Sequence, residues 1–383
     1  MKISMICCPF QTSFGFYGNA LKSALEEKTG AEVQWVGSNC GCGDPSEVNR
    51  IYEAKKCDYF DMVVPNDFRS KSLWKQRVRG LARTVVFSAR AKRFAQLSRE
   101  AEVAHFQQVL NAYGSKTVFS WLKRPTTSKR IVTVHELDND QIQCKDNNLT
   151  YNRADAVIVH CQEVKDQLIN LGVRPEKLHV VLHGTTIPEP SSGPRQGIVF
   201  YGGHKLMTNK GLDTLMRAMA IIRDRMTPTP PTLTIHGHYA LETPAEAVQL
   251  AAKYGVADNI VWLNQISEEE TVKLYQRSLV CVLPYRGSFA GGAAGLASAC
   301  GLPVVCTRKA GLTDHLGDTG IWIEENNAEQ LAEKVIELLK DEKLRSAAAA
   351  RAMQRAQDYL RWDIIAEQTL RIYGSSNGRR QAA

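Results

Sequence analysis

A glycine-rich segment in the last third of the chain contains the residue types that bind anions. After an apolar run at residues 279–283, residues 284–305 read PYRGSFAGGAAGLASACGLPVV. The run predicts a buried strand, and the glycines at 287–292 open a helix whose first backbone N–H groups have no partners within the helix. Those N–H groups favour a phosphate, because the helix dipole adds the equivalent of about half a positive charge and glycine permits close approach. Such a loop also turns a chain tightly without binding anything, so the neighbouring motifs have to decide.

The composition predicts a soluble chain of two domains. Its 383 residues are 44% hydrophobic, and no run of about 18 apolar residues occurs. No secretory signal peptide is recognisable, because the apolar run at the N-terminus is too short. The cysteines, Cys161, Cys281, Cys300 and Cys306 among them, stand in apolar contexts that suit reduced core thiols, which indicates a cytoplasmic protein. The CGC motif at residues 40–42 lacks a CxxC pair and a neighbouring histidine, so we expect no metal there.

Residues 68–99 carry a concentration of positive charge. The formal net charge of the chain is +8, and this window contains no acidic residue. Its basic residues include Arg77, Arg79 and Arg83, and apolar residues recur beside them at helical spacing. An apolar stripe flanked by cations is typical of a helix on a membrane surface, and an amphipathic helix docked on its own domain fits equally well. We expect no nucleic acid as a partner, since no recognition motif accompanies the charge.

Strand-like and helix-like segments alternate along the chain. Short β-branched runs, such as residues 131–134 and 156–160, are separated by helical segments, which predicts parallel sheets with crossover helices. The segment PEPSSGPR, ending at residue 195, interrupts the pattern and is typical of a linker. We therefore expect an α/β protein of two doubly wound domains, the first at residues 1–188 and the second from residue 189. The polar residues 375–383 predict a flexible tail.

Several motifs in a fixed order resemble the retaining glycosyltransferases of family 4. They are TVHEL at 133–137, ADAVIV at 154–159, YGG at 201–203, NKGLDTL at 209–215 and CGLPVV at 300–305. The resemblance spans nearly the whole chain, and the motifs are specific in combination. It implies the GT-B fold, in which two Rossmann-like domains face a cleft. It further implies that the second domain ends at residue 361 and that a helix at residues 362–374 packs back on the first.

The resemblance also implies which residues form the site. Lys210 corresponds to the lysine that contacts the diphosphate of the donor, and His135 to the strand-end histidine near the transferred sugar, so these two are the expected catalytic residues. Together with the glycine-rich segments, it gives these further donor-side residues: Gly15, Gly203, His204, Lys205, Gly237, Ser288, Phe289, Ala290, Gly291 and Gly292. On the acceptor side the candidates are His105, Arg77, Arg79 and Arg83. A histidine satisfied within the core is the competing interpretation of His105 and His135.

Two features depart from the family pattern. The family carries two glutamates eight positions apart around the C-terminal loop, and the corresponding positions here are Ser288 and Leu296. The arginine that usually precedes the lysine is also missing, and His204 and Lys205 are the candidates to supply its charge. These losses make a non-catalytic GT-B scaffold or binding protein one alternative to an enzyme.

The expected reaction is the transfer of a sugar, with retention of its anomeric configuration, from a nucleotide-sugar donor to a saccharide or lipid-linked acceptor. A UDP- or GDP-sugar is the expected donor, and glycan biosynthesis the expected context. The leaving diphosphate must be held and neutralised, and Lys210 and the amides of residues 287–292 meet this requirement. Because no Asp-x-Asp motif accompanies the donor loop, we expect neither a metal nor another cofactor. A sugar-nucleotide epimerase or hydrolase on the same fold is a further alternative.

If the basic segment rests on an anionic membrane, the protein is cytoplasmic with peripheral membrane contact. Neutralising Arg77, Arg79 and Arg83 together should then weaken binding to anionic vesicles by about 1 kcal/mol per residue and leave donor affinity unchanged. Vesicle sedimentation at two lipid compositions, anionic and neutral, measures this. Equal vesicle binding by the triple variant and the unaltered chain would contradict the membrane interpretation.

Overall fold

The chain forms two compact units in a computed structural model that describes residues 1–7, 13–38, 58–60, 101–107, 128–135, 151–203, 206–207, 209–237, 244–264, 266–287, 291–309 and 311–375. The first unit comprises Met1–Val181 together with Trp362–Ala383, and the second comprises Leu182–Arg361. The first unit therefore ends at Val181, a few residues before the linker-like segment. The helix that begins at Trp362 belongs to the first unit although it follows the second in sequence.

The first unit is built on a seven-stranded sheet whose neighbouring strands are all parallel. Its strand order is β3-β2-β1-β4-β5-β6-β7. The strands are β1 (Lys2–Cys7), β2 (Glu32–Ser38), β3 (Asp58–Phe60), β4 (Val103–Gln107), β5 (Lys129–Val134), β6 (Ala156–Val159) and β7 (Leu178–Val180). The central strands β4 and β6 are buried along their whole length. The sequence of β6, AVIV, is accordingly a continuous apolar run, whereas β4, VAHFQ, also buries the polar His105 and Gln107.

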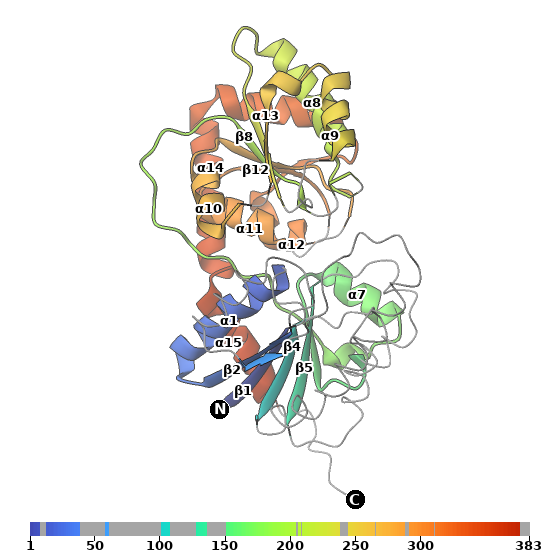
Figure 1. Cartoon of the computed structure of the whole chain (residues 1–383), viewed down its shortest axis with the longest axis vertical. Helices are drawn as coiled ribbons and strands as arrows, with labels where there is room; N and C mark the ends of the chain where they lie inside the picture. The colour runs from blue at the N-terminus through green and yellow to red at the C-terminus, as the bar shows by residue number, and fades with distance from the viewer. Residues whose placement is uncertain are drawn as a thin grey trace, which may run out of the picture. The chain divides into compact units, whose positions relative to one another are not determined.

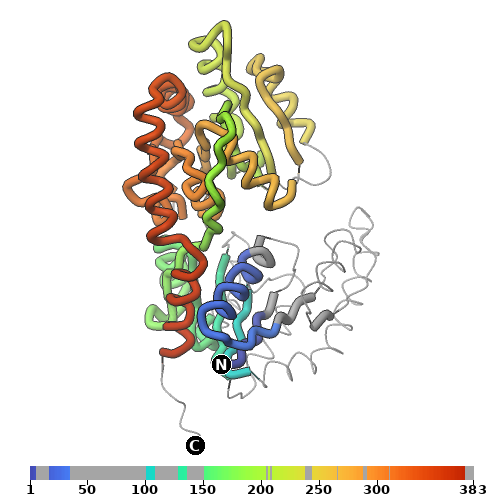
Figure 2. Tube along the Cα trace, turned by 90° about the vertical axis from the view of Figure 1, so that its left-hand side faces the viewer, coloured from blue at the N-terminus to red at the C-terminus, as the bar shows by residue number. Residues whose placement is uncertain are grey.

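Three helices of the first unit are described: α1 (Ser13–Thr29), α7 (Gln162–Asn170) and α15 (Trp362–Gly374). Helix α15 lies beside α1 in both views, so the last helix of the chain packs against the first (Figures 1 and 2). The ammonium of Lys129 at the start of β5 donates to the carbonyls of Ile372 and Tyr373 at 2.6 and 3.1 Å. Carbonyls in the last turn of a helix have no partners within it, so this lysine fixes the end of α15 to the sheet.

The second unit contains a six-stranded parallel sheet of order β10-β9-β8-β11-β12-β13. The strands are β8 (Ile198–Tyr201), β9 (Leu233–His236), β10 (Ile260–Leu263), β11 (Val280–Leu283), β12 (Val304–Thr307) and β13 (Ile321–Ile323). Its helices are α8 (Leu212–Arg225), α9 (Ala245–Lys253), α10 (Glu268–Gln276), α11 (Gly292–Ala299), α12 (Leu312–Leu316), α13 (Ala328–Lys340) and α14 (Glu342–Tyr359). Helix α13 packs against α8, and α11 packs against α14 (Figure 1).

The core of the second unit forms where β8, β11 and β12 meet these helices. All four residues of β11 and of β12 are buried. The cysteines Cys281, Cys300 and Cys306 are free and buried there, as expected for core thiols, and burial raises the pKa of the Cys300 thiol to about 12. Thiols of this kind stay protonated and unreactive at neutral pH.

The expected α/β architecture of two doubly wound domains is confirmed, and the alternation of buried strands with helices is what made it predictable. Strand β3, of three residues, was not expected, because it is too short to show a hydrophobic pattern. Within the described ranges, no helix combines the length and the apolar character that crossing a membrane requires.

The turn into α8 approaches the β11–α11 loop so closely that position 211 has no room for a side chain. Gly211 has a φ of +68°, and a Cβ there would lie 1.9 Å from the carbonyl oxygen of Pro284. Backbone cannot move aside as a flexible side chain can, so the glycine is required both for its conformation and for the approach.

Replacing Gly211 with alanine should therefore destabilise the second unit severely. We expect about 1–2 kcal/mol from the left-handed backbone and about 1–3 kcal/mol more from the clash with Pro284. Gly172→Ala is the matched control, because Gly172 has a φ of +89° but nothing within 4 Å of the added Cβ. Chemical unfolding of the two variants measures the difference, and equal losses of stability would show that the approach to Pro284 is unimportant.

Candidate functional site

The carboxyl ends of β8, β11 and β12 lie at one edge of the second sheet and are tied to one another. The hydroxyl of Tyr285, after β11, donates to the carbonyl of Tyr201 at the end of β8 at 2.7 Å. The hydroxyl of Thr307, at the end of β12, donates to the carbonyl of Tyr285 at 2.5 Å. In open parallel sheets, ligands bind at this edge, where loops leave the strands. The hydrogen bonds therefore give the loops of this edge a fixed base.

Lys210 is held on aromatic rings at this edge. Its side chain is 5% exposed, and its ammonium lies 3.8 Å from the centre of the Tyr285 ring and 5.6 Å from that of Tyr201. Gly203 packs on the same group, since a Cβ there would lie 3.2 Å from the Tyr201 ring and 3.6 Å from Cε of Lys210. Rings attract a cation through their negative faces, so the two tyrosines favour the charged form of this nearly buried lysine. An anion that reached this ammonium would meet a cation that is poorly screened by water.

The turn that contains Lys210 is joined to the loop after β11. The backbone amides of Arg286 and Gly287 donate to the carbonyl of Asn209 at 2.8 and 3.4 Å. The contact between Gly211 and Pro284 lies on the other side of the lysine in sequence. The lysine and the start of the glycine-rich loop are thus parts of one local structure. They are far apart in sequence: Asp213 and Arg286, which also meet here, are separated by 73 positions.

Helix α11 begins at Gly292, directly after the left-handed Gly291, and both glycines lie against histidine rings. A Cβ at Gly291 would lie 2.2 Å from Nδ1 of His315, and one at Gly292 would lie 3.3 Å from Cε1 of His183. A side chain at Gly291 would overlap the His315 ring, whereas one at Gly292 would make only a tight contact with the His183 ring. As in any α-helix, the first N–H groups of this eight-residue helix have no partners within the helix, and its N-cap makes no side-chain hydrogen bond.

The two histidines are linked to each other and to the backbone. Nδ1–H of His315 donates to the carbonyl of Gly311 at 2.7 Å, and its Nε2 accepts from the backbone N–H of His183 at 2.9 Å. Nδ1–H of His183 donates to the carbonyl of Gly184 at 2.7 Å. Burial lowers the pKa of His315 to about 3 and that of His183 to about 4, so both are neutral at physiological pH.

The end of β9 contributes a further buried histidine. His236 is 3% exposed, and its Nε2 lies 3.1 Å from the Tyr275 hydroxyl. Its carbonyl accepts from the Gly202 amide at 2.8 Å, which fixes the glycine that precedes Gly203. Gly237 follows directly after this strand end. The expected positions Gly203, Lys210, Gly237, Gly291 and Gly292 therefore all follow or join carboxyl ends of strands in this sheet.

In the first unit, polar side chains at the ends of β4, β5 and β6 form one hydrogen-bonded line. Nδ1 of His105 lies 2.6 Å from the hydroxyl of Tyr373, and its Nε2 lies 2.7 Å from Oγ1 of Thr133 and 3.5 Å from the amide of Gln107. Oε1 of Gln107 lies 3.0 Å from Nε2 of His135. Nδ1 of His135 lies 3.0 Å from Nε2 of His160, whose Nδ1–H donates to the Val181 carbonyl at 2.9 Å.

The two expected histidines of the first unit differ in their surroundings. His105 is fully buried, burial lowers its pKa to about 3, and both its nitrogens have partners, which is the geometry of a core histidine. His135 is 5% exposed at the end of β5, and both of its ring nitrogens contact protein groups. Gly15 lies in the first turn of α1.

Several other residues singled out in the sequence lie outside the described residues, and one packs on the core. His204, Lys205, Ser288, Phe289, Ala290, Arg77, Arg79 and Arg83 lie outside the described residues. Leu296, at the second position that lacks a glutamate, is partly buried in α11 and packs on the core. In the part of the chain that the structure describes, no group of three or more potential ligands could hold a metal ion.

Sequence reasoning did not find several residues that shape this site. The rings of Tyr201 and Tyr285, the buried His315 and the pair Gln107 and His160 were not singled out. A weak signal was present for His160, which directly follows the apolar run of β6 at a strand end. No signal in one sequence shows that His315 contacts His183, because the contact joins segments 132 residues apart.

Comparison with known families identifies the second unit as the more recognisable part. Residues 195–341 match the model of the family described as glycosyl transferases group 1. Lys210 and the glycine-rich segment both fall within this match.

The similar curated proteins are named D-inositol 3-phosphate glycosyltransferase. The protein from Rhodococcus jostii is 28% identical over 240 residues, which cover 57% of this chain and 52% of that protein. The one from Salinispora arenicola is 30% identical over 191 residues, which cover 48% and 42%. The chain thus matches about half the length of these curated relatives.

Solved structures match over nearly the whole chain. Sucrose-phosphate synthase from Thermosynechococcus elongatus has a TM-score of 0.74 at 18% identity and covers 97% of this chain and 98% of its own. Anabaena HepE in complex with UDP and glucose has a TM-score of 0.73 at 16% identity, with the same coverage. At these identities the likeness concerns the fold, which is the GT-B fold of glycosyltransferases, as the sequence motifs had indicated.

Proposed function

We propose that the chain transfers a sugar from a nucleotide-sugar donor to a saccharide or lipid-linked acceptor, with retention of configuration and without a metal. One observation carries the proposal. Within the residues that match group 1 glycosyltransferases, the buried ammonium of Lys210 and the glycine N-terminus of α11 occupy the same edge of the sheet. The solved HepE structures, in complex with UDP or UDP-glucose, support a UDP-sugar, with a GDP-sugar as the second choice.

The chemistry follows from the charges at this edge. Breaking a sugar–phosphate bond leaves a diphosphate that must be neutralised as it departs. The ammonium of Lys210 and the first amides of α11 are fixed before the reaction, so they stabilise the developing charge without rearranging. Lys210 therefore acts as the catalytic cation in this proposal, in the role that a magnesium ion has in metal-dependent transfer.

His135 is the proposed sugar contact from the first unit. Gln107 and His160 contact its two ring nitrogens, so this role requires that one of these contacts is exchanged for a sugar hydroxyl. His105 has no such role in the proposal, since its ring is fully buried.

The first test is a thermal-shift screen with UDP, GDP, ADP, dTDP and their sugar conjugates, each with and without EDTA. A nucleotide at about 100 times its dissociation constant should stabilise the fold by about 2.7 kcal/mol. The shift should persist in EDTA and shrink in Lys210→Ala, where a roughly ten- to hundredfold loss of affinity lowers the stabilisation to about 1.4–0.4 kcal/mol. Lys253→Ala is the matched control, because Lys253 also lies over a tyrosine ring of the same unit, at the end of α9.

The outcomes separate the candidate functions. A nucleotide that binds in EDTA and transfers its sugar with the same anomeric configuration, read by NMR of the product, supports the proposal. Binding without turnover of any donor favours the scaffold, and release of free sugar or an epimer without an acceptor favours a hydrolase or epimerase. If no nucleotide binds, the proposal fails at its first step.

The histidines behind Gly291 and Gly292 give the second unit a predictable dependence on pH. His315 donates through Nδ1 and accepts through Nε2, which only the neutral ring can do. In the unfolded chain the same group titrates near its ordinary value of 6.5, against about 3 in the folded chain. As pH falls below 6.5, the unfolded state therefore binds more protons than the folded state, and stability decreases until pH approaches the folded value.

We therefore expect the unfolding free energy to fall as pH drops from about 6.5 towards 4, and to fall less in His315→Gln, which removes one titrating group. Urea unfolding at about pH 7, 6 and 5 measures the slope for both proteins. An identical slope in the variant would mean that His315 is not held neutral by the folded structure.

A further inference from the structure

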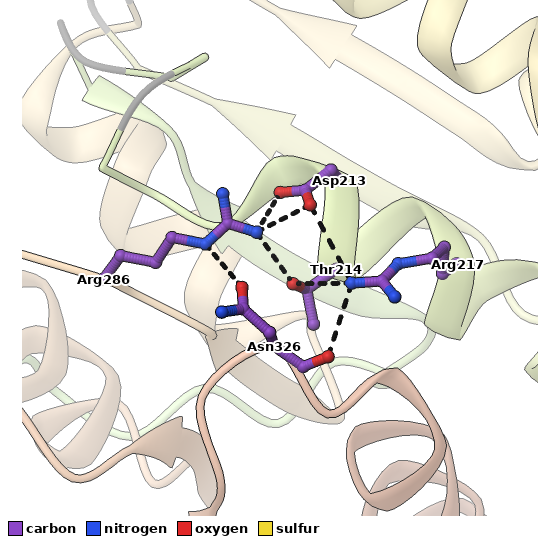
Figure 3. A network of polar contacts seen from close by, with 5 residues as sticks. All are labelled: Asp213, Thr214, Arg217, Arg286 and Asn326. Carbon is purple, nitrogen blue, oxygen red and sulfur yellow. Dashed lines mark hydrogen bonds and ion pairs between the residues drawn. The ribbon is translucent and has the colours of Figure 1, made fainter.

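Arg286, in the loop after β11, is the centre of a network that joins three loops of the second unit (Figure 3). Its Nη2 lies 2.5 and 2.6 Å from the two carboxylate oxygens of Asp213, and 3.2 Å from Oγ1 of Thr214. Its Nε donates to Oδ1 of Asn326 at 2.7 Å. Asp213 is in the first turn of α8, and Asn326 precedes α13, so one guanidinium connects the loops that follow β8, β11 and β13.

Asn326 is fixed by two arginines at once. Its side chain accepts from Arg286, and its backbone carbonyl accepts from Arg217 at 3.3 Å. Among the residues that the structure describes, Asn326 is the one non-glycine residue with a positive φ, at 62°. A left-handed residue costs energy unless its surroundings hold it. The two hydrogen bonds hold Asn326 in this conformation and give Arg286 a second contact besides Asp213.

The network fixes the stem of the glycine-rich loop. Four sequence positions separate Arg286 from the left-handed Gly291, and the amides of Arg286 and Gly287 donate to the carbonyl of Asn209. The ion pair with Asp213 thus holds Arg286, and the backbone contacts with Asn209 hold both Arg286 and Gly287. Both contacts reach the turn that contains Lys210.

Arg286 is paired with Asp213, whose carboxylate also lies 3.8 Å from Nη2 of Arg217. Partial burial would raise the pKa of Asp213, but the hydrogen bonds and the charge of Arg286 outweigh it and hold the pKa of that carboxyl below its usual value. The carboxylate therefore stays ionised at neutral pH, with two oxygens directed at one guanidinium. Nε and Nη2 of Arg286 are thus directed at oxygens of the protein, on a carboxylate, a hydroxyl and an amide, rather than at a ligand.

We propose that Arg286 is a positioning residue: it clamps the glycine-rich loop against the Lys210 turn and does not itself bind the donor's diphosphate. This inference depends on the proposed nucleotide site in the second unit. The competing assignment makes Arg286 a direct phosphate ligand, as an arginine beside a glycine-rich loop would suggest. The two assignments predict opposite effects when Asp213 loses its charge.

The test measures UDP binding by calorimetry in EDTA for Asp213→Asn, Arg286→Gln, Arg286→Lys and the Asp213→Asn/Arg286→Gln double variant. If Arg286 is a clamp, each single variant should weaken UDP binding by roughly three- to tenfold. The double variant should bind UDP no more weakly than the single variant with the lower UDP affinity. UDP binding by Arg286→Lys should also be weakened, because an ammonium cannot hold Asp213 and Asn326 in the same fork geometry. If Arg286 binds phosphate, Asp213→Asn frees the guanidinium and tightens binding, which overturns the proposal.

Arg225 and Glu329 provide the matched control, since they form an ion pair between α8 and α13 with side chains about half exposed. Arg225→Gln and Glu329→Gln change the net charge by the same amounts as the test variants but do not touch the loop. Equal loss of UDP affinity in these controls would assign the effect to net charge and overturn the clamp.

Hydrogen exchange without nucleotide separates the clamp from the proposed function. In Asp213→Asn, the amides of Arg286 and Gly287 should exchange at least about threefold faster than in the unaltered chain, because the loop opens more often. Unchanged exchange overturns the clamp even if UDP binds. Faster exchange in a chain that binds none of the nucleotides would still support the contact between Arg286 and Asp213 as a clamp on the loop. It would overturn the proposed function and with it the role of Arg286 at a nucleotide site.

Discussion

The second unit depends on the close contact between the Lys210 turn and the loop after β11. Gly211 meets the Pro284 carbonyl at a distance that excludes any side chain, and the amides of Arg286 and Gly287 close the contact from the loop side. Parallel strands bring the two segments to one edge, but parallel strands alone leave their loops free to separate. Here backbone meets backbone, so the position of Lys210 relative to residues 284–287, where the loop begins, is determined before any ligand arrives.

Buried histidines extend this rigidity without adding charge. His183, His236 and His315 are all neutral, because burial lowers the pKa of each. A neutral imidazole both donates and accepts, so one ring can join two backbone groups that a lysine or a carboxylate could not join. Lys210 and the amides of α11 therefore bring positive charge to an edge whose histidines add none, which suits a site that must attract an anion.

The sequence contained enough to predict the fold class and the part of the site that lies on strand ends. Apolar runs alternating with helical segments predicted the parallel sheets, and the NKGLDTL motif located Lys210. The remaining contacts depend on which loops meet, and no local pattern encodes this. Arg286 and Asp213 stand 73 residues apart, and His135 and His160 stand 25 apart, so only the register of the sheet brings either pair together. The contact of Tyr201 and Tyr285 with Lys210 could not be predicted for the same reason, since each tyrosine has the local sequence of an ordinary core residue.

The hydrogen-bonded line in the first unit bears on how His135 should be studied. One end of the line is the Val181 carbonyl, where the chain leaves the first unit, and the other is Tyr373 in α15, after the chain has returned to it. His135 therefore contributes to holding both segments as well as standing at a strand end. A loss of activity on replacing His135 is consistent with both a structural role and a sugar contact. A change in the stability of α15 is consistent only with the structural role. Because His160 touches the same ring without being a proposed sugar contact, its replacement separates the structural contribution of the line from any contribution of His135 to the reaction.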